Sequence, residues 1–189
     1  FFYYFATGVT PAMEEKMVGL GSQYAWTARD ALGNALDGGK SYRLRLPPNV
    51  PVKDFWSVIL YSNQTRSMIQ TDQRFPSVSS QTKGLQKNPD GTVDVFFGPK
   101  PPVGKETNWV QTVPGTGWNT ILRLYGPLEP WFAKTWRPGE IEPVSDDYRE
   151  TLIDRIDGLV AKIADCRKQA DARSLDLVAR LRFVETCAR

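Results

Sequence analysis

The sequence predicts a mainly β protein, an antiparallel β-sandwich of jelly-roll type with an α-helical C-terminal extension. Aromatic residues make up 12% of the chain and there are 14 prolines, which is typical of a sheet protein rich in turns. Short apolar or alternating segments recur up to residue 126, each followed by turn residues. The third observation is a change of composition at Val144. All prolines, all six Trp and 14 of the 15 Gly precede it. We therefore expect a sheet domain at 1–144 and a helical tail at 145–189.

The first expected strands are separated by turn residues. We leave residues 1–19 open between a short helix and an extended lead-in. Residues 24–39, YAWTARDALGNALDGG, carry an apolar run and then two turn signals, so they predict a hairpin. Residues 41–46, SYRLRL, alternate apolar side chains with two arginines and end at a Pro-Pro pair. One face of this strand is therefore expected to be buried and the other charged.

The later strands follow the same logic. Residues 54–62, DFWSVILYS, form a nearly continuous apolar run suited to a central, buried strand. Residues 88–102 place Pro-Asp-Gly before an alternating strand that ends at Gly98. Residues 118–126 predict another core strand. We expect Ile121 to face the core and leave open whether its neighbour Leu122 does so too.

Residues 127–139 contain two Trp, one Phe and three Pro. We interpret this segment as a proline-stiffened crossover, in which Trp131, Phe132 and Trp136 close the end of the sandwich.

The tail has the periodicity of a helix. Ser145 is a good N-cap, and apolar positions then recur with steps of four and three residues. These positions are Leu152, Ile156, Leu159, Ile163, Cys166 and Ala170. Ser174 can begin a second helix, so a helical hairpin and a single long helix both fit. Three roles stay open: packing on its own domain, homodimerisation through 145–189, or a segment foreign to the sandwich.

Composition excludes several classes of function. The net charge of +3 is spread along the chain, which does not fit a nucleic-acid binder. No apolar run reaches the length needed to span a membrane. The chain has no histidine, which removes Ser-His and Cys-His nucleophiles and His-ligated metals. The cysteines, Cys166 and Cys187, lack metal-binding spacing and are interpreted as small apolar helix residues. We expect no metal and no cofactor.

Two segments rich in polar and aromatic residues are candidates for a ligand site. Residues 61–74 follow the buried strand, at an end of the sandwich where ligand loops are common. Residues 108–118 pair two Trp with side-chain amides around a Pro-Gly turn, a chemistry suited to sugar-like or small polar-aromatic ligands. Such Trp are also common in cores, where the indole N–H finds a carbonyl, and we favour that interpretation of the two. The candidate contacts are Tyr61, Asn63, Asn108, Trp109, Gln111 and Trp118, with Lys134 and Arg137 as rim residues.

A catalytic alternative uses carboxylate chemistry without histidine. Asp72 would act as the base, and Arg66 or Arg74 would stabilise developing negative charge. This would make the protein a hydrolase or a lyase. It requires Asp72 and an arginine to converge in one pocket.

Four segments together resemble a known bacterial family. They are DGGKSYRLRLPPNVP, DFWSVILYSNQTRSMIQTDQRFPS, NPDGTVDVFFGPKPP and NWVQTVPGTGWNTILRLYGPLEPWFAKTWRPGEIE. The chain is similar over residues 8–143 to the domain of unknown function 1214. This resemblance implies a jelly-roll β-sandwich and no established reaction. It also implies a partner, because the family usually follows a domain of unknown function 1254. Members usually end near RPGEIE, so the resemblance leaves residues 144–189 unexplained.

The sequence begins at Phe1 with neither an initiator methionine nor a leader peptide. We therefore expect it to belong to a longer protein in which a partner domain precedes it. Its localisation stays open between the cytoplasm, the periplasm and secretion.

Overall fold

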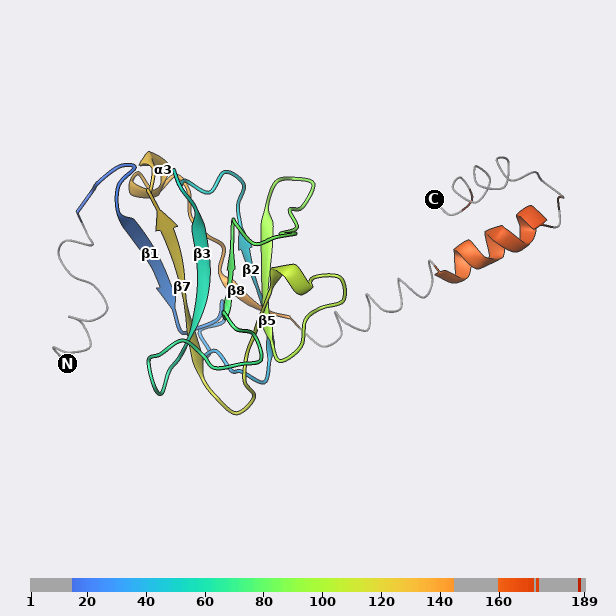
Figure 1. Ribbon diagram of the computed structural model, residues 1–189, viewed down its shortest axis with the longest axis horizontal. Helices are drawn as coiled ribbons and strands as arrows, with labels where there is room; N and C mark the ends of the chain where they lie inside the picture. The colour runs from blue at the N-terminus through green and yellow to red at the C-terminus, as the bar shows by residue number, and fades with distance from the viewer. Residues whose placement is uncertain (1–14, 145–159, 172, 174–186, 188–189) are drawn as a thin grey trace. The chain divides into compact units, whose positions relative to one another are not determined.

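The computed structural model describes residues 15–144, 160–171, 173 and 187 of the 189-residue chain (Figure 1). The chain divides into two compact units, residues 1–144 and residues 145–189. We describe each unit by itself. That the two units are separate domains stays a prediction. Residues 1–14 of the opening segment lie outside the described residues.

The first unit contains two four-stranded sheets. The first sheet is antiparallel, in the order β1 (Ser22–Thr27), β7 (Trp118–Tyr125), β3 (Trp56–Ser62) and β4 (Ser77–Ser79). The second has the order β6 (Trp109–Gln111), β5 (Val93–Gly98), β2 (Ser41–Leu46) and β8 (Ile141–Val144). The prediction of a mainly β fold is confirmed.

One strand pair departs from the antiparallel prediction. Strand β6 runs parallel to β5, with Phe97 opposite Val110. A parallel neighbour needs a connection that returns to the starting end of the sheet. The connection from 99 to 108 contains three prolines and ends in the 3-10 turn η1 (Glu106–Asn108). It is therefore not the tight hairpin that an antiparallel pair would use.

The strands alternate as the sequence predicts, with one exception. In β2, Tyr42 and the two leucines are buried while the arginines face outward. In β7, Leu122 and Leu124 are buried, whereas Ile121 is only half-buried. Trp118 begins the inward series of this strand, and the period of two then turns Ile121 outward. The prediction that Ile121 faces the core was wrong.

Buried side chains from both sheets form one hydrophobic core. Trp118 from the first sheet is fully buried. Its ring centre lies 5.7 Å from that of Tyr42 in β2 and 5.0 Å from that of Phe97 in β5. Burial of such a side chain stabilises the fold by about 1.5–3 kcal/mol. Aromatic contacts therefore tie the first sheet to the second.

The crossover after β7 begins with the short helix α3 (Glu129–Phe132). Trp136 joins the core and donates its indole N–H to the Pro48 carbonyl at 3.2 Å. Trp131 packs against the core, with its ring centre 6.5 Å from that of Trp136. Phe132 is half-buried outside this cluster. Two of the three aromatic residues expected to close the fold therefore pack on its core.

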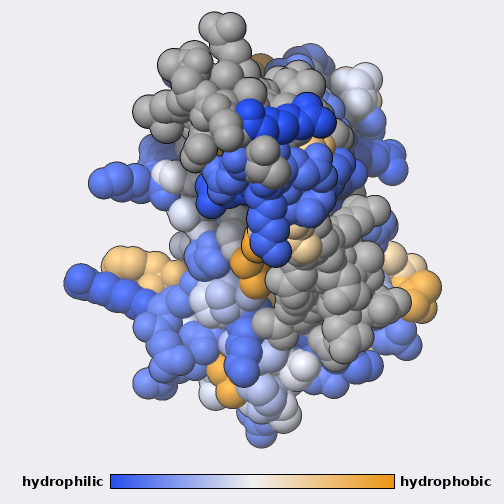
Figure 2. Space-filling view, turned by 90° about the vertical axis from the view of Figure 1, so that its right-hand side faces the viewer, coloured by the Kyte–Doolittle hydropathy of each residue, from blue (hydrophilic) through white to orange (hydrophobic). Residues whose placement is uncertain are grey.

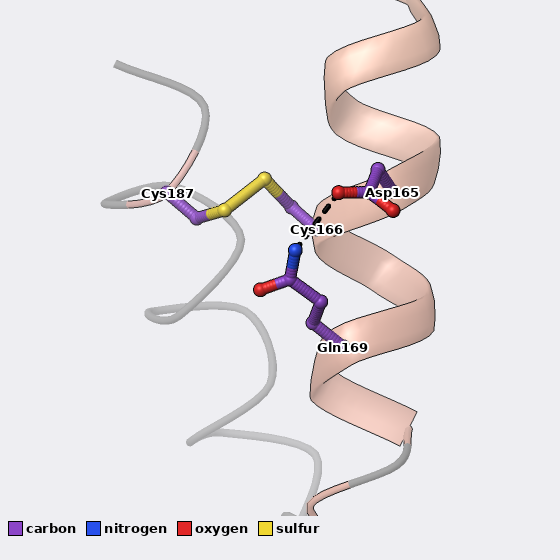
Figure 3. The surroundings of a disulfide bond; sticks show 4 residues. All are labelled: Asp165, Cys166, Gln169 and Cys187. Carbon is purple, nitrogen blue, oxygen red and sulfur yellow. Dashed lines mark hydrogen bonds between the residues drawn. A yellow bond between two sulfur atoms is a disulfide. The ribbon is translucent and has the colours of Figure 1, made fainter.

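In the second unit, residues 160–171 are helical. Cys166 and Ala170 are buried and Ile163 is half-buried, which places the described part of the predicted apolar seam on one face. Cys166 forms a disulfide with Cys187, 21 residues along the chain (Figure 3). Both cysteines are helical, as interpreted from the sequence, but that interpretation did not include the disulfide between them. The earlier seam positions, the Ser145 cap and the second helix from Ser174 lie outside the described residues.

The described surface is that of an ordinary globular protein. Figure 2 shows one face, on which hydrophilic residues predominate among those in colour and hydrophobic residues are scattered. Among the described helices, none has the length and apolar character that a membrane span requires.

Candidate functional site

The two segments chosen from the sequence meet at one open depression of the first unit. Its volume is about 380 Å³. One wall comes from the loop after β3, and the other from the end of β6 and the turn that follows it. The lining residues are Gln70, Thr71, Asp72, Gln111, Thr112, Val113 and Pro114. The fold therefore joins residues that lie about 40 positions apart in sequence.

Gln73 fixes the first wall against the edge of the second sheet. Its side-chain amide donates to the Trp109 carbonyl at 3.2 Å and accepts from the Gln111 N–H at 2.8 Å. These are the groups that a neighbouring strand would satisfy, so one side chain caps the exposed edge of β6. The sequence alone does not single out Gln73, because one glutamine in a polar loop carries no signal of such a role, whereas the structure shows it half-buried.

Asp72 and Gln111 form a reciprocal pair on the rim. The Asp72 main-chain N–H donates to Gln111 Oε1 at 3.0 Å, and Gln111 Nε2 donates to Asp72 Oδ2 at 2.9 Å. A carboxylate has two acceptor oxygens and an amide has two donor hydrogens. Among the described residues, Asp72 Oδ1 has no hydrogen-bond partner. The pair therefore presents an acceptor and a donor side by side.

The second wall is held by a close backbone approach at Gly38. Thr112 Oγ1 donates to the Gly38 carbonyl at 2.7 Å, and the Gly38 N–H donates to the Thr116 carbonyl at 2.9 Å. A Cβ atom at Gly38 would lie 2.0 Å from the Val113 carbonyl oxygen, so only glycine fits there. The turn that carries Val113 and Pro114 is therefore anchored to the body of the unit.

Two of the predicted ligand contacts serve the fold instead. Trp118 is fully buried in the core and cannot present its ring to a ligand. Asn108 is 2% exposed and bonded on both sides of its amide. It accepts from the Gln86 N–H at 2.8 Å and donates to the carbonyls of Gln86 and Asp94 at 2.9 Å each. Both positions are therefore corrected from ligand contacts to structural residues.

Tyr61, Asn63 and Trp109 do not line the depression. The Tyr61 hydroxyl accepts from Arg123 Nη2 at 2.7 Å on the outer face of the first sheet. Asn63 Nδ2 donates to the Trp118 carbonyl at 3.2 Å. The Trp109 indole donates to the Gly98 carbonyl at 2.9 Å. Each of these side chains thus has a partner within the fold.

Lys134 and Arg137 belong to the crossover and do not line the depression. Lys134 places its ammonium 5.6 Å from the ring centre of Trp131. Arg137 is exposed.

The residues proposed for catalysis do not converge. Asp72 is exposed, and its partner is Gln111. Arg74 lies over the ring of Phe75 at 5.3 Å. Arg66 occupies a turn with a φ of 63°, where its N–H donates to the Ser62 carbonyl. Within the described part of the chain, no arginine lies at ion-pair distance from Asp72.

Metal binding has no support at this site. Across residues 15–144, 160–171, 173 and 187, no three Asp, Glu or Cys side chains gather closely enough to hold a metal ion.

Comparison with known proteins gives a family but no activity. The family model described as "Protein of unknown function (DUF1214)" matches residues 21–129, more than half of the chain. The crystal structure of the VPA0106 protein from Vibrio parahaemolyticus is 26% identical with a TM-score of 0.58, over 76% of this chain and 34% of that one. An uncharacterized protein from Burkholderia cenocepacia is 21% identical with a TM-score of 0.43, over 67% and 31%. This chain spans about a third of both structures. No curated protein matches it.

Proposed function

Because the chain belongs to the DUF1214 family of proteins of unknown function, we propose a function from its site: it binds a small sugar-like ligand in the depression between 70–72 and 111–114. The observation that carries this proposal is the Asp72–Gln111 pair on the rim. A carboxylate oxygen beside an amide N–H matches neighbouring hydroxyl groups, which both donate and accept hydrogen bonds. Val113 and Pro114 supply an apolar surface for the C–H face of a sugar ring.

The size of the site supports a small ligand. Its volume of about 380 Å³ lies at the lower end of the range for small-molecule pockets, which is roughly 300–1,000 Å³. The anchored turn at 112–116 and the Gln73 cap favour a preformed site. We also propose that the two sheets form a sandwich of jelly-roll type with this site at one end. Their shared core supports this arrangement.

Binding is favoured over catalysis by the environment of Asp72. A carboxylate base for a hydrolase or lyase needs a cation close to the developing negative charge. The partner of Asp72 is a neutral amide, and the ring of Phe75 lies under Arg74. The catalytic alternative therefore has less support than a binding role.

Calorimetric titration of the full chain with mono- and disaccharides tests the proposal. Asp72→Asn and Gln111→Leu should each weaken binding by about tenfold, because each removes a hydrogen bond to the ligand. Asp54→Asn and Gln81→Leu are matched controls at exposed positions outside the lining. The proposal fails if no sugar binds at millimolar concentration, or if the control variants lose as much affinity as the site variants.

The tail has a separate proposed role in assembly. The buried face at Cys166 and Ala170 supports packing of the tail helix against another segment. If residues 145–189 mediate homodimerisation, deleting them should convert a dimer into a monomer of the remaining 144 residues, as measured by light scattering. An oligomeric state unchanged by the deletion would leave this role without support.

A further inference from the structure

The outer face of the first sheet, turned away from the shared core, carries an unusual set of side chains. Register places Tyr24, Arg123 and Ser57 in one row across β1, β7 and β3. The next row is apolar and consists of Trp26, Ile121 and Ile59. Figure 1 shows these three strands lying side by side in one layer. This face is separate from the depression at 70–72 and 111–114.

Arg123 is held between aromatic rings. Its Nη2 donates to the Tyr61 hydroxyl at 2.7 Å. Its guanidinium carbon lies 5.5 Å from the ring centre of Tyr24 and 6.0 Å from that of Tyr61. Burial lowers the pKa of Arg123, but the neighbouring phenols of Tyr125, Tyr61 and Tyr24 raise it by more, so it lies above its ordinary value. The guanidinium is thus an oriented, permanent positive charge.

This charge has no counter-charge within the described residues. The ion pairs there join Lys16 to Glu129, Arg43 to Glu142 and Arg45 to Asp94. Burial removes part of the hydration of this cation, and the tyrosines around it, rather than a carboxylate, compensate for that loss. Arg123 therefore differs from the paired arginines of the second sheet.

Unsatisfied polar atoms lie in the same row. Arg123 Nε is buried without a hydrogen-bond partner, and so is the Oγ of Ser57, which is directly opposite in the register and 6% exposed. Arg43 Nε is also buried without a partner, but the Arg43 guanidinium pairs with Glu142. At Arg123, an orphaned buried donor and a charge without a carboxylate partner coincide. The accessible part of the half-buried guanidinium is the group that an anion can reach.

The apolar row defines the rest of the ligand. Residues two apart along a strand lie about 6.6–6.8 Å apart on the same face, which is close to the length of a substituted aromatic ring. Ile121 is two residues before Arg123 in β7, and Trp26, which is 55% exposed, is opposite Ile121. A flat ring beside an anion would therefore cover Ile121 and Trp26.

We propose that this face binds a small aromatic carboxylate, with its anion on Arg123 and its ring against Ile121 and Trp26. A guanidinium fork matches a carboxylate in two parallel hydrogen bonds, whereas a lysine would act as a point charge. The Tyr61 hydroxyl orients the fork. The ligand class follows from one charge, two apolar side chains and the spacing between them.

Tryptophan fluorescence of the full chain tests this site, because Trp26 lies in it. Benzoate should change the emission in a saturable way, and Trp26→Phe should remove most of that change. Benzamide has the same ring without the charge. It should bind at least about tenfold more weakly than benzoate, because a charge-assisted hydrogen bond is lost. Inorganic phosphate, an anion without a ring, should also bind more weakly than benzoate.

Variants at Arg123 separate this site from a general charge effect. Arg123→Met should abolish benzoate binding, and Arg123→Lys should weaken it by about tenfold. Arg43→Met is the matched control, since it removes an equal charge from an outward position of the second sheet. Near-ultraviolet circular dichroism checks folding. If Arg123→Met does not fold, Tyr61→Phe, which frees the guanidinium, should still weaken binding.

Three outcomes would overturn the proposal. Benzoate and benzamide could bind equally, or Arg43→Met could lose as much binding as Arg123→Met. The third is that benzoate does not bind while Arg123→Met lowers the mass seen by light scattering, which would assign the face to contact between two copies of the chain.

Discussion

The outer faces of the two sheets differ in whether their arginines have carboxylate partners. On the second sheet, Arg45 makes two hydrogen bonds to Asp94, at 2.7 and 3.1 Å, and Arg43 pairs with Glu142. On the first sheet, Arg123 lies among tyrosines without a carboxylate partner in the described residues. All three arginines alternate with apolar residues on their strands. Similar strand patterns therefore lead to different electrostatics.

Register accounts for this difference. Arg45 is opposite Asp94 and Arg43 is opposite Glu142, so unlike charges face each other across neighbouring strands. Arg123 is opposite Tyr24 on one side and Ser57 on the other. The second sheet neutralises its own outer face, whereas the first leaves a charge for a ligand. The comparison predicts a structural role for one face and a binding role for the other.

Both outer faces belong to sheets that share one hydrophobic core. The variant Trp118→Ala tests this shared core, and its effect on the free energy of unfolding is the largest that we expect. Trp118 is fully buried between Tyr42 and Phe97. Truncation should lower the free energy of unfolding by about 4 kcal/mol because it leaves a large cavity. Urea denaturation followed by circular dichroism measures it. Trp118→Phe should cost less, since it also removes a buried indole N–H without a partner. A loss below about 1 kcal/mol for the alanine variant would contradict a shared core.

Asn108→Ala should have the next largest effect. This buried amide holds the backbone at Gln86 and Asp94 beside the second sheet. Its removal leaves three backbone groups without partners, and the expected loss is about 3 kcal/mol in urea denaturation. The exposed Asn34, bonded to Asp30 at 3.3 Å, provides the control, and Asn34→Ala should cost well under half as much. Equal losses would show that burial of the Asn108 amide is not decisive.

Residues 41–46 show how far the sequence alone could go. Their alternation predicts which side chains are buried, because strand geometry has a period of two, and the structure agrees. The alternation cannot predict that Arg45 meets Asp94, because register depends on turns and on contacts between distant segments. The parallel pairing of β5 and β6 was missed for the same reason.

The candidate site stays a prediction, although parts of both segments chosen from the sequence line one depression. A polar loop after a buried strand tends to lie at the end of a sheet, which is why proximity could be expected. The roles of individual residues were harder to assign. Trp118 and Asn108 look like ligand contacts in sequence, but burial and hydrogen bonds make them structural. Arg123 looks like a solvent-facing arginine, since the tyrosines around it come from three strands.

Comparing Arg45→Met with Arg123→Met tests the difference between the two faces directly. Arg45→Met leaves the Asp94 side chain, which is only 13% exposed, without its cation. The free energy of unfolding should fall by about 1 kcal/mol, a modest loss because solvent screens the exposed arginine. Arg123→Met breaks no ion pair and removes only the hydrogen bond to Tyr61 and the contacts with tyrosine rings, so its loss of unfolding free energy should be smaller than that of Arg45→Met. Paired urea titrations at pH 7 measure both variants. A larger loss for Arg123→Met would reverse the comparison.

The pH dependence of Asp94 sharpens the same point. Burial raises the pKa of Asp94, but hydrogen bonds from Arg45 and Asn88 and nearby positive charge lower it by more, to below its ordinary value of 3.8. A lowered pKa in the folded state means that the stabilisation is present above pH 4 or so and is lost as the pH falls through the folded value. Asp94→Asn should therefore be about 1 kcal/mol less stable than the wild type at neutral pH. That gap should close as the pH falls below 3.8 and through the lowered pKa of the folded state, and a constant gap would exclude this linkage.

The smallest expected effect concerns Trp26, and it separates binding from folding on the first sheet. Trp26 is 55% exposed and donates its indole N–H to Asn119 Oδ1 at 2.9 Å. Trp26→Ala should change the free energy of unfolding by about 0.5 kcal/mol or less, because most of the ring is already in water. It should nevertheless weaken benzoate binding, since the ring forms part of the apolar row. A large loss of stability would mean that this indole supports the fold, and the outer face of the first sheet would then be structural like that of the second.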